Sequence, residues 1–174
     1  NYSEYLSKEK KLRVIFRGIN IDYFNSKNIS VLKQEKLKQE WDLSSNKFTI
    51  LLPGRLTYWK GQEKFIEALN ILIEDFNTTN FQAIILGSDQ GRKVYSKKLI
   101  NLVQRYSLNK KVKFIQHCNE MPLAYSLADV VVSASIEPEA FGRVSVEAQS
   151  MGKPIVASNI GGSKETIINK KTGF

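Results

Sequence analysis

The stretch "FTILLPGRLTYWKGQEKFIEALNILIEDF", residues 48–76, carries the pattern that decides the fold. It begins with a short, continuously apolar run that ends at Pro53 and Gly54. It continues with a segment in which apolar residues recur at helical spacing from Phe65 to Phe76. A continuously apolar strand followed by an amphipathic helix is typical of a parallel sheet that helices cover on both faces.

The same alternation continues to the end of the chain. Apolar runs predict further strands at residues 81–87, 111–116, 129–135 and 153–158, and helical spacing predicts helices at residues 94–108, 121–128 and 142–150, with another beginning at Ser163. Right-handed crossovers then make an α/β domain with a doubly wound, Rossmann-like parallel sheet. In such sheets, ligands bind beyond the carboxyl ends of the strands, where the strand order reverses.

The beginning of the chain does not follow this alternation. Residues 14–24, "VIFRGINIDYF", predict a strand, a turn and an aromatic anchor. Residues 31–43 predict an isolated helix. The repeating α/β pattern therefore starts after about Asn46.

The composition is that of one soluble globular domain. The chain has 174 residues, of which 42% are hydrophobic and 25% are charged. No apolar run reaches the ~20 residues that a membrane-spanning helix needs, and the first residues lack the apolar core of a secretory signal. The single cysteine, Cys118, excludes an internal disulfide and fits a reducing cytosol. We therefore expect a cytoplasmic protein.

The net charge of +9 leaves two classes of function open. A positive field attracts anionic partners, such as phosphate-bearing small molecules, nucleic acid or an anionic membrane surface. One class is an enzyme that binds a phosphorylated substrate, and the other is a non-enzymatic basic module that binds RNA or an anionic membrane surface. The lysines are scattered, and aromatic residues do not interleave with them as a stacking platform for nucleic acid requires.

The loop after the first predicted strand, "PGRLTYWKG", carries two cationic side chains at the edge of the sheet where a ligand is expected to bind. Arg55 follows the strand end at Gly54, and Lys60 precedes the next helix. An arginine fork and a lysine point charge suit a diphosphate, and the free N–H groups of the following helix add to the positive potential. The alternative interpretation is two ordinary surface cations in a loop.

Two carboxylates flank the start of another predicted helix in "EPEAFGRVSVEAQ", residues 137–149. Glu139 precedes the helix and Glu147 lies in its second turn, so the backbone N–H groups of Phe141, Gly142 and Arg143 between them are expected to point at a cleft. A carboxylate accepts hydrogen bonds from neighbouring hydroxyls, as in a ribose or hexose diol. Acids for sugar hydroxyls beside amides for phosphate are the pattern of a nucleotide-sugar site. The alternative is an exposed loop acid and a helix-surface acid favoured by the helix dipole.

These motifs together resemble those of the retaining glycosyltransferases of the GT-B fold, family 4, also called glycosyl transferases group 1. "EAFGRVSVEA" resembles the family's E-x7-E signature, and "LLPGRLTYWKGQEKFIEAL" is similar to its strand and diphosphate-binding loop. "AIILGSDQG", "VKFIQH", "MPLAYSLADVVVSAS" and "GKPIVASNIGGSKETI" match in order and spacing, so the resemblance covers residues 14–174.

The resemblance implies a domain organisation. Residues 14–174 would be the nucleotide-sugar-binding C-terminal GT-B domain, truncated before its final helices, and residues 1–13 a linker or a remainder of an N-terminal domain. The N-terminal domain, which binds the acceptor, would then be missing, so we expect the fragment alone to be inactive.

The resemblance also implies roles for single residues. Glu147 would hold the ribose and Glu139 the donor hexose, while Arg55 and Lys60 would bind the diphosphate and stabilise its leaving charge. Arg55, Lys60 and Glu139 are the expected catalytic residues. The expected donor-binding set is Gly54, Arg55, Lys60, Gln116, His117, Glu139, Ala140, Phe141, Gly142 and Glu147.

The activity that follows is transfer of a hexose from a nucleotide-diphosphate sugar to a glycan or lipid-linked acceptor, with retention, in the assembly of bacterial surface polysaccharide or lipopolysaccharide. No cofactor or metal is expected, because the family uses basic residues for the diphosphate and the sequence holds no metal-ligand cluster. The partners are the donor and the acceptor, with peripheral contact at the cytoplasmic face of the inner membrane and no nucleic acid. A nucleotide-sugar epimerase is a further alternative, against which the "FGRVSVEA" context argues.

Three positions depart from the family pattern. Phe16 stands where the family usually has proline, which alters a turn and not the chemistry. Gln116 and His117 replace a common glycine after the predicted strand at residues 111–116, which puts contacts with the nucleotide base in question. We expect His117 to be a loop residue rather than a catalyst.

Overall fold

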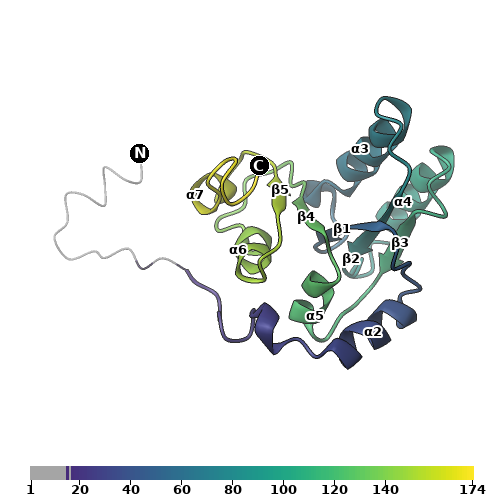
Figure 1. The fold of residues 1–174 in the computed structure, drawn as a ribbon. Coiled ribbons are helices and arrows are strands. Elements are labelled where there is room, and N and C mark those ends of the chain that lie inside the picture. Colours follow the sequence, from purple (N-terminus) through teal and green to yellow (C-terminus); the bar gives the residue numbers. More distant parts are fainter. Residues whose placement is uncertain (1–14, 16) are drawn as a thin grey trace, which may run out of the picture.

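The computed structural model describes residue 15 and residues 17–174 (Figure 1). In this part of the chain, five strands form one parallel sheet in the order β3-β2-β1-β4-β5. The strands are β1 (Phe48–Pro53), β2 (Phe81–Leu86), β3 (Val112–Ile115), β4 (Val130–Ser133) and β5 (Ile155–Ala157). The helices are η1 (Ser26–Asn28), α2 (Val31–Glu40), η2 (Tyr58–Lys60), α3 (Gln62–Glu74), α4 (Lys93–Arg105), α5 (Met121–Ser126), α6 (Arg143–Ser150) and α7 (Ser163–Thr166). The predicted doubly wound α/β fold is confirmed.

The strand order reverses between β1 and β4. From β1 the chain adds β2 and β3 on one side, and it then returns to add β4 and β5 on the other side. β1 and β4 are in direct register, with Ile50 opposite Val130 and Leu51 opposite Val131. In open parallel sheets, the ligand site lies beyond the carboxyl ends of the strands at such a point.

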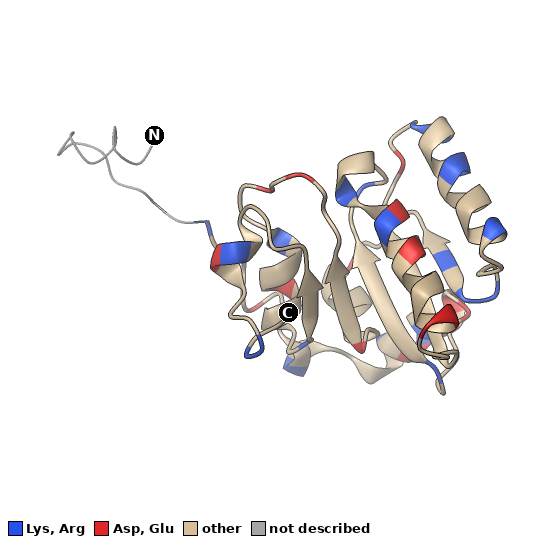
Figure 2. Ribbon diagram, turned by 90° about the horizontal axis from the view of Figure 1, so that it is seen from above, with Lys and Arg blue, Asp and Glu red and all other residues tan. Residues whose placement is uncertain are grey.

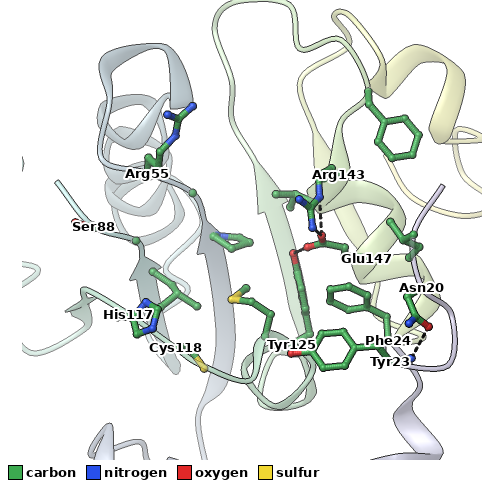
Figure 3. A pocket seen from close by; sticks show the side chains of 18 of the residues that line it. Asn20, Tyr23, Phe24, Arg55, Ser88, His117, Cys118, Tyr125, Arg143 and Glu147 are labelled. Atoms are coloured by element: carbon green, nitrogen blue, oxygen red, sulfur yellow. Dashed lines mark hydrogen bonds and ion pairs between the residues drawn. The ribbon is translucent and has the colours of Figure 1, made fainter. Parts of the chain in front are cut away.

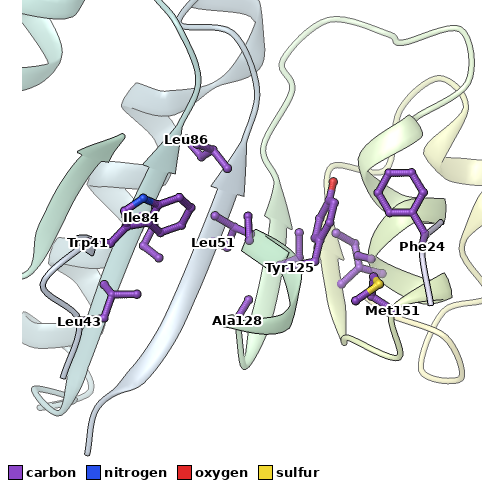
Figure 4. Close-up of a cluster of buried hydrophobic side chains, with 13 residues drawn as sticks. Phe24, Trp41, Leu43, Leu51, Ile84, Leu86, Tyr125, Ala128 and Met151 are labelled. Atoms are coloured by element: carbon purple, nitrogen blue, oxygen red, sulfur yellow. The ribbon is translucent and has the colours of Figure 1, made fainter. Parts of the chain in front are cut away.

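One face of the sheet packs against α5 and α6 (Figure 4). Leu51 and Ile84 point from β1 and β2 into a cluster that includes Tyr125 of α5 and Met151 after α6. All four side chains are at most 1% exposed. Burying an apolar side chain of this size contributes about 1.5–3 kcal/mol, so this layer fixes the position of α6 against the sheet.

The other face packs against α3 and α4. Ile50 and Leu52 alternate with Leu51 along β1 and join Ile66 of α3 and Leu99 of α4 in a second cluster. Because both faces of β1 are buried, its sequence is continuously apolar rather than alternating.

The segment before β1 closes the α5 and α6 face of the sheet. Phe24 is 6% exposed and meets the Tyr125 ring edge-on, with 6.0 Å between ring centroids, so the predicted aromatic anchor is confirmed. Residues 17–24 contain no strand, so that part of the prediction is wrong there, while Val14 and Phe16 lie outside the described residues. The helix predicted over residues 31–43 is confirmed as α2, but it is not isolated, because it contacts α5. The Gln34 side chain of α2 donates a hydrogen bond of 3.2 Å to the backbone oxygen of Ser126 in α5.

Lysine and arginine residues lie on several helices and loops around the sheet rather than on one element (Figure 2). Among the described helices, none combines the length and the apolar character needed to cross a membrane.

Candidate functional site

A cleft of about 910 Å³ opens at the carboxyl ends of the strands (Figure 3). Its lining includes Gly54 and Arg55 after β1, Gly87 and Ser88 after β2, Gln116 and His117 after β3, Phe141, Arg143 and Glu147 around α6, Tyr125 of α5, and residues 17–20 with Tyr23 and Phe24. Arg55 lies on one side of the cleft, and Arg143 and Glu147 lie on the other (Figure 3). The cleft therefore occupies the place that the strand order predicts.

Two glycines form the floor of the cleft. The N–H of Gly54 donates to the backbone oxygen of Leu86 at 2.8 Å. A Cβ on Gly87 would lie 2.0 Å from the backbone oxygen of Gly54. Only glycine allows β1 and β2 to end so close together, and this close approach leaves open the space above them.

A buried glutamine supports the loop that carries Arg55. Gln62 is fully buried, and its Nε2 donates to the backbone oxygen of Arg55 at 2.8 Å. The Tyr95 hydroxyl donates to Gln62 Oε1 at 3.2 Å. Burial is the main cause that raises the pKa of Tyr95, to about 12, so this donor keeps its proton at neutral pH. The exposed Arg55 side chain thus projects from a fixed backbone.

Lys60 and Glu139 form a largely buried ion pair. Lys60 Nζ lies 2.8 Å from Glu139 Oε1, and the two side chains are 17% and 23% exposed. Ser135 Oγ donates to the same oxygen. Burial raises the pKa of the Glu139 carboxyl, but Lys60, Ser135 and Arg55 together hold it below its ordinary value, so the group is charged at neutral pH. No described residue donates to Oε2, which stays available to a ligand hydroxyl.

Glu147 is held by two partners inside the cleft. Its side chain is 7% exposed. The Tyr125 hydroxyl donates to Oε2 at 2.8 Å. Arg143 donates to Oε1 from Nε at 3.1 Å and from Nη2 at 2.9 Å. Burial and the charge of Glu147 raise the pKa of Tyr125 well above its ordinary value, so the phenol remains a hydrogen-bond donor.

The first turn of α6 provides free backbone donors. Gly142 caps the helix in the left-handed conformation, with φ of 73°. Among the described residues, none accepts a hydrogen bond from the N–H of Phe141, Gly142 or Arg143. A second loop supports this turn from below, because the N–H of Gly162 donates to the backbone oxygen of Glu139 at 2.7 Å. Unpaired amides at a helix start are an anion-binding arrangement.

The far end of the cleft lies after β3. Gln116 and His117 are both exposed there. His117 Nε2 lies 2.7 Å from Asn119 Oδ1, within the same loop. Neither side chain contacts Glu147 or Glu139 within hydrogen-bond distance, so His117 stands apart from both acids.

The structure brings most of the predicted site residues to this edge of the sheet. The cleft lining includes Gly54, Arg55, Gln116, His117, Phe141 and Glu147. It does not include Lys60, Glu139, Ala140 or Gly142. Lys60 nevertheless passes along the cleft floor, since a Cβ on Gly54 would lie 3.5 Å from Lys60 Cδ. The two acids are therefore held differently, Glu147 inside the cleft and Glu139 beside it.

Comparisons with known proteins show the family of this chain. The sequence profile described as Glycosyl transferases group 1 matches residues 33–174. This chain belongs to the group 1 glycosyltransferases. An uncharacterized glycosyltransferase of Methanocaldococcus jannaschii is 34% identical over 168 residues, which are 95% of this chain and 41% of that relative.

Two solved structures share the fold of this chain. A glycosyltransferase from Rickettsia africae has a TM-score of 0.89 at 35% identity, over 99% of this chain and 46% of that one. The Anabaena protein HepE, solved in complex with UDP and glucose, has a TM-score of 0.82 at 33% identity, over 93% of this chain and 42% of that one. The fold is therefore that of a GT-B glycosyltransferase domain. The chain spans about two fifths of the length of the first curated relatives that it matches.

Three side chains that line or support this glycosyltransferase domain's cleft, Arg143, Tyr125 and Gln62, were not predicted from the sequence. Arg143 could have been found, because it stands four residues before Glu147 on one helix, the spacing of an ion pair. Tyr125 lies in an apolar segment and has the pattern of a core residue, whereas Gln62 lies among charged residues, where an exposed position is expected. Within the described residues, no group of three or more His, Cys, Asp or Glu side chains is close enough to hold a metal ion.

Proposed function

We propose that this domain binds the donor of a family 4 glycosyltransferase, which transfers a hexose from a nucleotide-diphosphate sugar to a glycan or lipid-linked acceptor with retention. The observation that carries the proposal is the cleft at the strand reversal, where the buried acid Glu147 lies across from Arg55, and where the amides of Phe141 and Gly142 at the start of α6 have no acceptor among the described residues. An acid for a sugar diol beside donors for a diphosphate suits the nucleoside diphosphate part of a nucleotide-sugar donor. HepE, at 33% identity, was solved with UDP and glucose, which supports a donor of this class.

The proposed arrangement of the donor follows the cleft from end to end. The base lies near Gln116 and His117, and the ribose donates to Glu147. The diphosphate then lies between Arg55 and the α6 amides of Phe141 and Gly142, with the backbone of Ala140 and Gly54 near it. The hexose continues beyond the helix start toward Glu139, whose free Oε2 accepts from its hydroxyls.

The chemistry of the leaving group depends on fixed positive charge. As the glycosidic bond breaks, negative charge develops on the diphosphate, and donors already aimed at it stabilise that charge without reorganisation. Lys60 can act here while it remains paired, because its ammonium has three N–H donors and Glu139 uses one. In the proposed mechanism the acceptor attacks the anomeric carbon on the face from which the diphosphate leaves, and no metal takes part.

We also propose the setting of the reaction. The family resemblance supports a cytoplasmic enzyme in bacterial surface polysaccharide or lipopolysaccharide assembly, with the acceptor bound by an N-terminal domain. The net charge of +9 is compatible with peripheral contact at an anionic leaflet, where each nearby Lys or Arg contributes about 1 kcal/mol. Co-sedimentation with anionic vesicles at low salt tests this contact, and a chain that stays in the supernatant contradicts it.

A ligand panel followed by two variants tests the donor proposal. Nucleoside diphosphates and their sugar derivatives should raise the unfolding temperature of the chain, because a ligand that binds only the folded state stabilises it. Glu147→Gln should lower the affinity for nucleoside diphosphate and for nucleotide-sugar alike, by about tenfold. The reason is that hydrogen bonds to a charged acceptor contribute about 1.5–3 kcal/mol. Glu139→Gln should weaken only the nucleotide-sugar.

The exposed Glu74, at the end of α3, gives a matched control. Glu74→Gln makes the same chemical change far from the cleft and should leave both affinities unchanged. The roles assigned to the two acids are contradicted if the Glu139 and Glu147 variants each lose affinity for both ligands equally. They are also contradicted if neither variant loses affinity for either ligand.

A further inference from the structure

Glu147 has too few free acceptor positions for a ribose in this structure. A carboxylate offers about four lone-pair positions, two on each oxygen. Arg143 Nε and Nη2 both donate to Oε1, at 3.1 and 2.9 Å, and the Tyr125 hydroxyl donates to Oε2 at 2.8 Å. One position remains, whereas a ribose diol donates two hydrogen bonds. One of the present partners must therefore leave when a diol binds.

Arg143 is the partner that can leave. Tyr125 is fully buried, and its ring packs in the core, so its hydroxyl would have no water to bond to if it lost Glu147. The Arg143 side chain is 68% exposed, and water replaces the carboxylate at little cost when the guanidinium moves. Figure 3 shows this difference, with Tyr125 approaching Glu147 from within the domain and Arg143 lying in the open cleft.

A diphosphate in the cleft would give Arg143 a second partner. Arg143 is the first residue of α6, directly after the unpaired amides of Phe141 and Gly142. A guanidinium pairs with two phosphate oxygens as readily as with a carboxylate, because the fork geometry matches both. A nucleoside without phosphates offers no such partner.

We propose that Arg143 determines specificity by exchanging Glu147 for the diphosphate when a nucleotide binds. This inference rests on the proposed function. While Arg143 pairs with Glu147, it competes with the ribose, and only a ligand with phosphates compensates for breaking that pair. The cleft therefore discriminates against nucleosides, and Tyr125 keeps the Glu147 carboxylate oriented during the exchange.

The test compares uridine with UDP on the wild-type chain and on Arg143→Met, by NMR titration of the labelled protein. The adenosine and guanosine pairs are run in parallel. We expect Arg143→Met to bind the nucleoside about threefold more tightly and the diphosphate about tenfold more weakly, so that the ratio of the two affinities falls about thirtyfold. Arg105→Met, which removes an exposed arginine in the last turn of α4, is the control and should leave the ratio unchanged.

A double-mutant cycle isolates the exchange. In the Glu147→Gln background, Arg143→Met should no longer improve nucleoside binding, because the competing ion pair is already gone. Circular dichroism checks that each variant is folded. If Arg143→Met does not fold, Arg143→Lys, which retains the charge and loses the fork, should still shift the ratio in the same direction.

Two results would overturn the inference, and they differ from failure of the proposed function. If the Arg143 variants lower the affinities for the nucleoside and for the nucleoside diphosphate by the same factor, Arg143 is only a structural support for Glu147. If the nucleoside binds more weakly to Arg143→Met, the exchange does not occur. If no nucleoside diphosphate binds the wild-type chain at all, the proposed function itself fails.

Discussion

The substitution Lys60→Met should destabilise the domain in a manner that depends on pH. Lys60 and Glu139 are 2.8 Å apart and 17% and 23% exposed. A methionine of similar length fills the same space without the charge, and it leaves the Glu139 carboxylate with only the Ser135 hydroxyl as a side-chain donor. The variant therefore measures what Lys60 contributes to holding this acid charged.

The expected loss is intermediate between that of a surface pair and that of a fully buried pair. Removing one partner of a fully buried ion pair costs about 3–5 kcal/mol, whereas exposed pairs contribute about 0–1 kcal/mol. About one fifth of each side chain reaches solvent here, so we expect a loss of about 2 kcal/mol at neutral pH.

The pH dependence follows from the pKa of Glu139. Its folded value lies below the ordinary 4.5, so in the wild type its stabilising contribution is present above pH 4.5 and is lost as the pH falls through the folded value. Removing Lys60 removes two of the effects that lower this pKa, so the folded pKa of Glu139 should be higher in the variant than in the wild type, and the variant should lose less stability as the pH falls. The difference in the free energy of unfolding between the wild type and Lys60→Met should therefore become smaller as the pH falls.

Urea unfolding followed by circular dichroism at neutral pH and near pH 4 measures this difference. Lys64→Met is the matched control, because Lys64 Nζ also lies 2.8 Å from a glutamate, Glu67, but with side chains 66% and 38% exposed. The stability of Lys64→Met should differ little from that of the wild type at either pH. The reasoning is refuted if Lys60→Met costs no more than Lys64→Met, or if its cost is the same at both pH values.

Two further predictions concern the supports of the cleft. Gln62→Leu leaves the backbone oxygen of Arg55 without its donor, so thermal unfolding should show a loss of about 1–3 kcal/mol, and a titration should show weaker nucleoside diphosphate binding. A stable variant with unchanged affinity contradicts this support. Gly61→Ala places a Cβ 1.8 Å from the backbone oxygen of Ala134 and should cost more than about 2 kcal/mol in urea unfolding. Gly152→Ala, with a similar φ of +68° and nothing within 4 Å, should cost only about 1 kcal/mol, and equal losses would contradict the steric argument.

Much of the fold could be predicted because its signals are local. The continuous apolar run before Gly54 requires burial on both faces, and that alone indicates a parallel sheet. The predicted strand ends also placed Arg55 and Gln116 at one edge, since parallel strands end together. The strand predicted for residues 14–24 is absent from residues 17–24. There the apolar side chains pack against the cluster that contains Tyr125, and the backbone does not pair with the sheet.

The pairing of side chains within the site could not be predicted in the same way. Glu139 and Lys60 are far apart in the sequence, and only the β1–β4 neighbourhood brings them together. Tyr125 looks like one more core aromatic until its hydroxyl is seen to face Glu147. Such contacts depend on tertiary packing, and hydrophobic periodicity predicts only secondary structure.

The most direct test of the proposed donor site is an NMR titration of the ¹⁵N-labelled chain with UDP-glucose, with the matching ADP- and GDP-glucose run beside it. The account predicts that the preferred donor shifts the backbone N–H signals of Gly54, Arg55, Phe141, Gly142 and Arg143, because these groups surround the diphosphate, and leaves the signals of α2 unchanged. Shifts confined to α2, or to the basic loops outside the cleft, would contradict a donor site at the strand reversal.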